Sequence, residues 1–263
     1  MNAYLVEAKR TAIGRAHPDK GLFCEARADE MLAALMNGLL AGMPTGEELT
    51  ESIDDIYIGC VGQHLEQGKN IARLSSLLAG LPDSVPGVTI NRLCASSLQA
   101  FNFAASAIAS GNADLLLAGG VEHMTHVPMQ AATDYHQELL ARYEFPFNNM
   151  GLTAEKVAKI YGVSREEQDA FAVASHAKAV SAQQAGYFNR EILPIPAGDA
   201  IADQDQSPRP GTNIAGLGAL KTIFMEDGTV TAGNSSPLND GASLTLMASG
   251  AACEKFALHR RAR

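Results

Sequence analysis

Short apolar runs alternate with helix-forming segments along the chain, and this alternation is the feature that most constrains the fold. The pattern predicts strands over 3–8, 54–61, 87–91, 113–122 and 242–249. It predicts helices between the first four strands, over 26–42, 68–82 and 95–111. Strands that are apolar throughout and joined by helical crossovers are typical of parallel sheets covered on both faces. We therefore expect an α/β fold with a mostly parallel five-stranded sheet covered by helices.

Residues 124–227 interrupt this rhythm. Two helices are predicted here, over 153–162 and 164–186, and the second opens with a capping box of Ser164 and Glu167. The remainder is loop-like, and a stretch of this length is too long for a simple connection. The domain prediction is then a core of 1–123 and 228–250, an inserted α-rich loop subdomain over 124–227, and a tail over 251–263.

Charge and cysteine spacing narrow the function classes. The formal net charge of −9 argues against a general nucleic-acid binder, although one arginine and a helix N-terminus can still hold a phosphate. The cysteines Cys24, Cys60, Cys94 and Cys253 are too widely spaced for a zinc site or a disulfide framework, so we expect no metal. The N-terminus lacks the apolar core of a signal peptide, and no run approaches transmembrane length. A cytoplasmic location, with no membrane partner, is expected.

Cys94 lies between the predicted strand 87–91 and the predicted helix 95–111. A thiol at a helix start lies in the positive field of the helix dipole, which favours the thiolate, and the helix N–H groups can support an oxyanion. No charged residue lies between Cys94 and Gly111, so we expect this helix to be buried on all sides. From the local sequence alone, Cys94 can be a small core residue or a nucleophile.

The segment "TINRLCASSLQA" resembles the nucleophile segment of the thiolase family, particularly of its degradative 3-ketoacyl-CoA thiolases. Further segments match the family in the expected order: "KRTAIGR", "DDIYIGCVGQHLEQGKNIAR", "LLAGGVEHMTHVPM", "MGLTAEKVA" and "GTVTAGNSSPLNDGAS". Together they span nearly the whole chain. Two positions depart from the pattern, because Ala12 replaces a usual proline and Ala95 replaces the glycine common after the cysteine.

The resemblance implies an acyltransferase in which Cys94 is acylated. Its thiolate would attack the keto carbonyl of a 3-ketoacyl-CoA, acetyl-CoA would leave, and a second CoA would take the shortened acyl group. The Cys94 backbone N–H would be one oxyanion donor. Coenzyme A would be a co-substrate, with no tightly bound cofactor. The resemblance also implies fatty-acid β-oxidation, a homodimer and, for bacterial degradative members, a hydratase–dehydrogenase partner subunit.

The same resemblance assigns coenzyme A contacts within and just after the inserted excursion. The residues implied are Met150, Arg209, Phe224, Ala232 and Ser236. Without the resemblance, Arg209 is a solvated loop residue, Met150 plain packing and Ser236 turn chemistry. Asn149 stands where short-chain biosynthetic members have a histidine, and Gly216 stands where those members have a serine that contacts coenzyme A.

The histidines His123 and His126 follow a predicted strand end, where ligands of open α/β sheets tend to bind. A structural role for both is the simpler interpretation.

The resemblance also implies "NEAF", "GHP" and "CxG" segments in a second half of the family's chain. Neither "NEAF" nor "GHP" occurs in these 263 residues, and the Cys-x-Gly spacing at Cys60–Gly62 lies in the segment "DDIYIGCVGQHLEQGKNIAR" already matched to the first half. Since catalytic groups act as a unit, a chain with the nucleophile but without the "GHP" histidine is expected to lose several orders of magnitude in rate. Three hypotheses stay open: the N-terminal part of a degradative thiolase, a non-catalytic remnant that binds acyl-CoA or a partner, and another thiolase-fold condensing enzyme. An acetoacetyl-CoA-forming biosynthetic thiolase is a further alternative.

Overall fold

The computed structural model describes residues 1–44, 46–131, 133–143 and 145–263. These residues form two compact units. The core unit consists of Met1–Ala132, Asn189–Gln206 and Leu238–Arg263, and the second unit consists of Thr133–Phe188 and Ser207–Pro237. The segment 189–206 therefore groups with the core unit, while the predicted boundaries at 123/124 and 227/228 stay a prediction.

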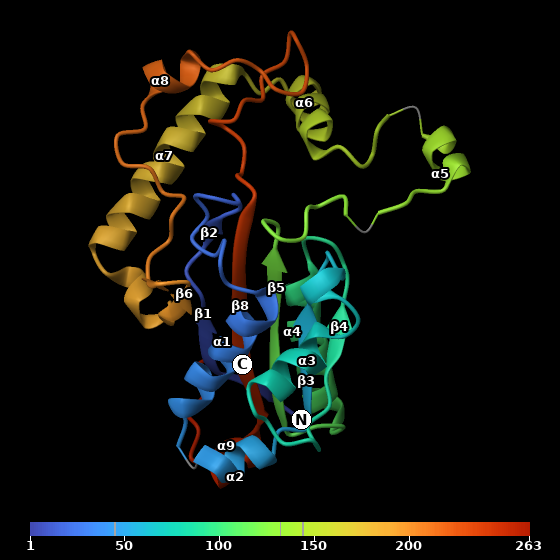
Figure 1. The fold of residues 1–263 in the computed structure, drawn as a ribbon, viewed down its shortest axis with the longest axis vertical. Coiled ribbons are helices and arrows are strands. Elements are labelled where there is room, and N and C mark those ends of the chain that lie inside the picture. Colours follow the sequence, from blue (N-terminus) through green and yellow to red (C-terminus); the bar gives the residue numbers. More distant parts are fainter. Residues whose placement is uncertain (45, 132, 144) are drawn as a thin grey trace. The chain divides into compact units, whose positions relative to one another are not determined.

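A single large sheet organises the core unit, with strand order β1-β8-β5-β3-β4 (Figure 1). The strands are β1 (Ala3–Arg10), β3 (Asp55–Gly59), β4 (Val88–Ile90), β5 (Leu115–His123) and β8 (Asn239–Ser249). The short strand β2 (Gly14–Arg15), which the sequence did not predict, pairs with the start of β8. The strands β3, β4 and β5 pair in parallel, while β8 is antiparallel to both β5 and β1. Every strand of the path except β8 therefore runs in one direction, which confirms the mostly parallel sheet.

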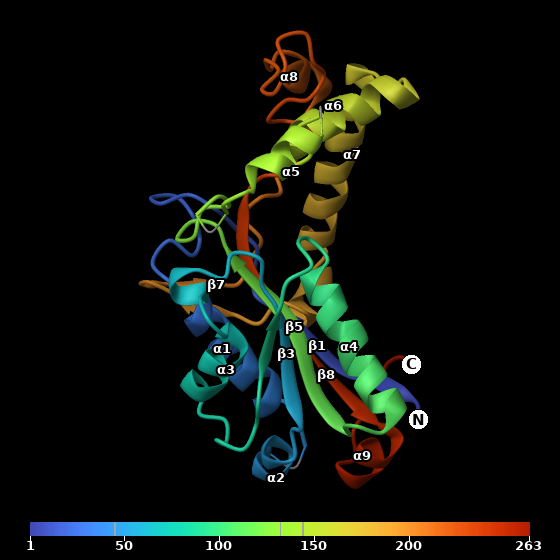
Figure 2. The same cartoon turned by 90° about the vertical axis from the view of Figure 1, so that its right-hand side faces the viewer.

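Helices cover both faces of this sheet (Figure 2). The helices α1 (Ala28–Ala41) and α3 (Ile71–Leu78) lie on one face, and α4 (Ser96–Ser110) lies on the other. Alternate residues of β5 divide between the two layers: Leu115 and Leu117 join the cluster with α1 and α3, whereas Leu116 and Ala118 pack against α4. This is the period-two alternation of a strand buried on both faces.

The remaining helices and strands of the core unit are short. They are α2 (Gly46–Glu51), the 3₁₀ helix η1 (Leu65–Gln67), β6 (Ile195–Ala197), β7 (Ala200–Ala202) and α9 (Gly250–Lys255). The strands β6 and β7 form a separate two-stranded antiparallel sheet. A further 3₁₀ helix, η2, spans Tyr187–Arg190.

The expectation that the helix after Cys94 is buried on all sides is wrong for the described chain. Its buried residues, Ser96, Ala100, Ala104 and Ile108, recur every four positions and form one face. The side chains of Leu98 and Phe103 on other faces are 63% and 45% exposed. A helix without charged residues is therefore not necessarily buried. In the described chain, small and apolar side chains also lie on the exposed faces of α4.

The second unit is helical. It contains α5 (Gln137–Arg142), α6 (Met150–Tyr161), α7 (Arg165–Gln184) and α8 (Ile214–Gly218). The predicted capping box at the start of α7 is present, with Ser164 accepting from the Glu167 N–H and Glu167 accepting from the Ser164 N–H. Among the described residues, none of the helices has both the length and the apolar character that a bilayer crossing requires.

Candidate active site

Cys94 is exposed at the junction of β4 and α4. The residue before it, Leu93, has a φ of +49°, in the left-handed region that residues with a side chain seldom adopt. The residue after it, Ala95, is the N-cap of α4 and makes no side-chain capping bond. The left-handed conformation of Leu93 turns the chain between β4 and α4. Cys94 therefore lies directly before the N-cap of α4. Of the two interpretations of its local sequence, burial in the core does not hold in the described chain.

Hydrogen bonds from the side chains on either side of Cys94 hold this turn. Asn91 Oδ1 accepts from the Leu93 N–H at 2.9 Å, and Asn91 Nδ2 donates to the Val61 carbonyl at 3.1 Å. Ser96 Oγ accepts from the Arg92 N–H at 2.8 Å and donates to the Leu93 carbonyl at 2.6 Å. Two backbone hydrogen bonds add to these, from the Ala95 N–H to the Arg92 carbonyl at 3.2 Å and from the Ser96 N–H to the Leu93 carbonyl at 3.0 Å. Side chains and backbone therefore hold the turn together, although the conformation of Leu93 is itself unfavourable.

Two glycines of the sheet allow the start of α4 to approach the strands closely. A Cβ at Gly59 of β3 would lie 2.4 Å from the carbonyl carbon of Ser96, and one at Gly120 of β5 would lie 2.0 Å from Ser97 Oγ. Only a residue without a side chain fits at either position. The glycines therefore set the depth at which α4, and Cys94 with it, lies on the sheet.

A hydrogen-bond network around the half-buried Glu122 supports Val61, the residue whose carbonyl Asn91 contacts. The Glu122 carboxylate accepts from the backbone N–H groups of Val61 and Gly62 at 2.9 and 3.1 Å, and from Gln67 Nε2 at 3.0 Å. Gln67 is fully buried, and its Oε1 accepts from the His123 N–H at 2.6 Å. Sequence reasoning missed Glu122 and Gln67, since nothing local signals that these residues, far apart in sequence, meet.

The other cysteines differ from Cys94 in their environment. Cys60 and Cys253 are buried, and Cys24 is half-buried. Burial, with a smaller contribution from the Glu122 charge, raises the pKa of the Cys60 thiol to about 12. Cys60 therefore stays a thiol at neutral pH and is not a nucleophile. Cys94 is the one cysteine of the four that is classed as exposed.

The histidines His123 and His126 stack with ring centroids 4.1 Å apart, next to Glu66. His126 Nε2 lies 2.9 Å from the Cys24 carbonyl, and its Nδ1 lies 3.1 Å from both oxygens of Glu66. Burial alone would lower the pKa of His126, but the hydrogen bonds to the Cys24 carbonyl and to Glu66 outweigh burial and raise the pKa. His126 therefore links its own segment to those of Cys24 and Glu66 through its two ring nitrogens.

The same three side chains bring potential metal ligands within 4.8 Å of one another. The ring nitrogens, however, already have hydrogen-bond partners: His123 Nε2 lies 3.0 Å from the Phe23 carbonyl, and its Nδ1 accepts from the His126 N–H at 3.3 Å. A metal would have to replace these bonds. We therefore assign the histidine pair a structural role, as the sequence suggested, and the expectation of no metal stays a prediction.

The five predicted coenzyme A contacts all lie in the second unit. Met150 is the first residue of α6 and is 69% exposed. Gly151, next to it, faces the Phe224 ring, which would lie 2.3 Å from a Cβ at that position. The Phe224 ring therefore lies against Gly151, the residue that follows Met150 at the start of α6. Asn149, the N-cap of α6, accepts from the Leu152 N–H at 3.0 Å, so it starts the helix that carries Met150.

The other three predicted contacts are exposed loop residues. The Arg209 N–H donates to His176 Nδ1 of α7 at 3.2 Å, and this bond anchors the loop rather than the guanidinium. Ala232 lies within a turn in which the Thr231 N–H donates to Asn234 Oδ1 at 2.8 Å, and Ser236 follows this turn. These hydrogen bonds do not connect Arg209, Ala232 or Ser236 to the start of α6, where Met150 lies.

Two buried carboxylates that sequence reasoning missed hold this turn on the helices. Glu155 of α6 is 6% exposed and accepts from the Thr229 N–H, the Thr229 hydroxyl and the Val230 N–H at 2.8–2.9 Å. Burial would raise the pKa of Glu155, but these hydrogen bonds prevail and lower it. Asp169 of α7 accepts from Asn234 Nδ2 at 3.0 Å and from Arg165 at 2.8 Å. The segment carrying Ala232 is therefore positioned by α6 and α7.

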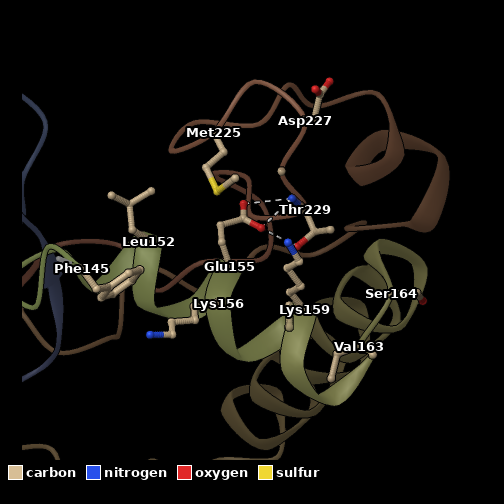
Figure 3. Close-up of a pocket in the computed structure, with 13 residues that line it drawn as sticks. Phe145, Leu152, Glu155, Lys156, Lys159, Val163, Ser164, Met225, Asp227 and Thr229 are labelled. Carbon is tan, nitrogen blue, oxygen red and sulfur yellow. Dashed lines mark hydrogen bonds between the residues drawn. The ribbon is translucent and has the colours of Figure 1, made fainter.

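A cavity of about 700 Å³ opens in the second unit between α6 and the segment 225–229 (Figure 3). Its walls include Phe145, Leu152, Val163 and Met225, together with Lys156 and Lys159 of α6. The Lys156 ammonium lies 4.5 Å from the centroid of the Phe145 ring. The five predicted coenzyme A contacts are not among the residues that line it, so this cavity and that set are separate features of the same unit.

The chain matches a family model described as the thiolase N-terminal domain over residues 3–251. It is 47% identical over 268 residues to a protein named 3-ketoacyl-CoA thiolase from Aliivibrio fischeri, with 100% of this chain and 68% of that protein covered. A relative with the same name from Pseudoalteromonas translucida gives the same identity and coverage. A third, from Cronobacter sakazakii, is 48% identical over 98% of this chain and 67% of its own length.

Proposed function

The chain belongs to the thiolase family, and we propose that it is the part of a 3-ketoacyl-CoA thiolase that carries the nucleophile, Cys94. The observation that carries this proposal is the exposed thiol on the left-handed turn at the start of α4. This geometry presents the sulfur to a substrate directly before the N-cap of α4. The relatives' shared name supports the reaction class.

In the proposed reaction, the Cys94 thiolate attacks the C3 carbonyl carbon of a 3-ketoacyl-CoA. The C2–C3 bond breaks, and its electron pair leaves on acetyl-CoA as an enolate, which takes up one proton. The acyl group stays on Sγ as a thioester. The thiol of a second CoA then loses its proton and attacks this thioester, so the shortened acyl-CoA leaves and Cys94 is regenerated.

By family resemblance, the protons are carried by a histidine and a second cysteine in segments that these 263 residues do not contain. We propose that both groups come from outside this stretch. The Cys94 N–H, at the start of α4, serves as one oxyanion donor of the acyl-transfer step.

For coenzyme A, we propose that Met150, at the start of α6, and Phe224, whose ring lies against the adjacent Gly151, contact the pantetheine arm. Arg209, Ala232 and Ser236 are proposed to complete the contacts, with coenzyme A as a co-substrate and no tightly bound cofactor. The finer assignments also stay proposals: a role in fatty-acid β-oxidation, a homodimer, a hydratase–dehydrogenase partner and a cytoplasmic location. Sedimentation velocity tests the dimer, since a monomer at all concentrations would contradict it.

The proposal is tested by turnover. The 263-residue chain is mixed with the C-terminal part of the Aliivibrio fischeri relative, and cleavage of acetoacetyl-CoA by CoA is measured. We expect cleavage, with a loss of at least about 1,000-fold in kcat for Cys94→Ala, because removal of a nucleophile costs this much or more. Cys24→Ala, at a half-buried cysteine, is the matched control and should keep the wild-type rate. Equal rates for the two variants, or no cleavage by a folded mixture, would contradict the proposal.

A further inference from the structure

The turn before Cys94 holds a leucine in a conformation that glycine normally provides. Leu93 has a φ of +49°, in the left-handed region that the side chain of a leucine makes unfavourable. Such a conformation persists only where surrounding contacts determine it. The side chains that supply those contacts therefore decide where the Cys94 thiol lies.

Ser96 contacts the turn on both sides of Cys94. Its hydroxyl accepts from the Arg92 N–H at 2.8 Å and donates to the Leu93 carbonyl at 2.6 Å. Both bonds run backwards along the chain, whereas a capping side chain would bond forwards to the N–H groups of its own helix. Ser96 is only 4% exposed, so water cannot readily replace its hydroxyl.

The surroundings of Ser96 hold the serine itself in place. Its backbone lies against Gly59 of β3, where any Cβ would collide with it, so α4 starts at a fixed depth on the sheet. Asn91 holds the Leu93 N–H from the other side and is anchored to the Val61 carbonyl. The left-handed residue is thus held at its N–H by Asn91 and at its carbonyl by Ser96.

We propose that Ser96 is a positioning residue of the reaction: it maintains the left-handed turn at Leu93 and thereby keeps the Cys94 thiol at the start of α4. This inference rests on the proposed function of Cys94 as the nucleophile. Ser96 acts through Leu93 and touches no substrate. Without its hydroxyl, Leu93 loses a contact that holds it in the left-handed region, so the turn relaxes toward a conformation that leucine prefers and the thiol moves away from the start of α4.

The test is the rate of Cys94 alkylation by iodoacetamide across a pH series, measured by peptide mass spectrometry on the whole 263-residue chain. For Ser96→Ala we expect the rate to fall about two- to five-fold, because the turn no longer holds the thiol in its exposed position at the start of α4. Ser110→Ala is the matched control, because the Ser110 hydroxyl makes the same kind of bond, to the Ala107 carbonyl at 3.0 Å, at the far end of α4.

Rescue separates positioning from a general loss of stability. Leu93→Gly removes the penalty of the left-handed conformation, so Leu93→Gly/Ser96→Ala should alkylate at close to the wild-type rate with the wild-type pH profile. A merely structural role for Ser96 predicts instead that the double variant stays slow. An unchanged rate in Ser96→Ala, or the same change in Ser110→Ala, would also overturn the proposal.

If Ser96→Ala does not fold, Asn91→Ala gives the same test from the other end of the turn. It should slow alkylation, and Leu93→Gly should again restore the rate; failure of this rescue would overturn the proposal. Because alkylation needs no acyl-CoA, the result does not depend on turnover. A folded but inactive mixture with the C-terminal part of the relative, together with the predicted alkylation pattern, would contradict the proposed function but not the role of Ser96 in placing the Cys94 thiol.

Discussion

At the scale of single residues, the exposed Cys94 differs from the buried Cys60 mainly by environment, since both follow a strand of the same sheet. The sequence located the candidate nucleophile through its motif, but the left-handed Leu93 was not predictable. A leucine gives no signal for positive φ, and the contacts that impose it come from Ser96 and Asn91 only once the chain is folded.

The buried carboxylates show the same limit. Glu155 and Asp169 lie on helices whose polar residues read as solvent-facing, and both instead bind loop segments more than 60 residues away in sequence. Glu122 meets the backbone of Val61 and Gly62 in the same way. Pairings of this kind follow from tertiary structure and leave no local pattern to interpret.

His126 gives a prediction about pH. Its pKa is raised in the folded chain, so its contribution to stability is fully present below about pH 6.5, the value for an unfolded histidine, and is lost as the pH rises through the folded value. We expect His126→Gln to lower the free energy of unfolding at pH 6 by about 1.5–3 kcal/mol, the range for hydrogen bonds to charged groups. The deficit should shrink as the pH rises to 8.

Urea unfolding at several pH values measures this difference. His64→Gln, at an exposed histidine, is the control and should change little at any pH. If the loss in unfolding free energy for His126→Gln stays constant from pH 6 to pH 8, the charge of His126 beside Glu66 does not contribute to stability.

At the scale of elements, the sheet strands and main helices follow from hydrophobic periodicity. The five predicted strands and the helices at 26–42, 68–82 and 95–111 are present, with ends shifted by a few residues. Periodicity could not show that β8 runs against the other strands, nor that one side of α4 is left uncovered in the described chain. Strand direction depends on the long connection through 124–227, and exposure depends on what packs on a face.

The glycines under α4 give a prediction at this scale. Gly59→Ala places a methyl group 2.4 Å from the backbone of Ser96 and Ser97, so α4 must move away from β3. We expect a loss of about 1–3 kcal/mol in unfolding free energy, as for other overpacked sites, together with slower Cys94 alkylation. Gly218→Ala, whose added Cβ meets nothing within 4 Å, should leave both unchanged.

Chemical unfolding and iodoacetamide labelling of the two variants measure these effects. Normal Cys94 alkylation in a destabilised Gly59→Ala chain would show that the depth of α4 on the sheet does not set the position of the thiol.

At the scale of the whole molecule, Cys94, the proposed nucleophile, and the proposed coenzyme A contacts belong to different compact units. The sequence indicated an excursion between core segments, because its rhythm changes after residue 123. The sequence could not show that residues 189–206 group with the core unit. There the Leu193 N–H donates to the Arg10 carbonyl. That grouping is set by tertiary hydrogen bonds rather than by composition.

The central claim, that Cys94 accepts an acyl group, is tested most directly by intact-mass and peptide mass spectrometry. The 263-residue chain is mixed with the C-terminal part of the Aliivibrio fischeri relative and incubated with acetyl-CoA. We predict one acetyl adduct on the 263-residue chain, located on Cys94 and absent from Cys94→Ala, because the thiol is exposed and held at the start of α4. A folded mixture that carries no adduct on Cys94, or carries the adduct on another cysteine of this chain, would contradict the account.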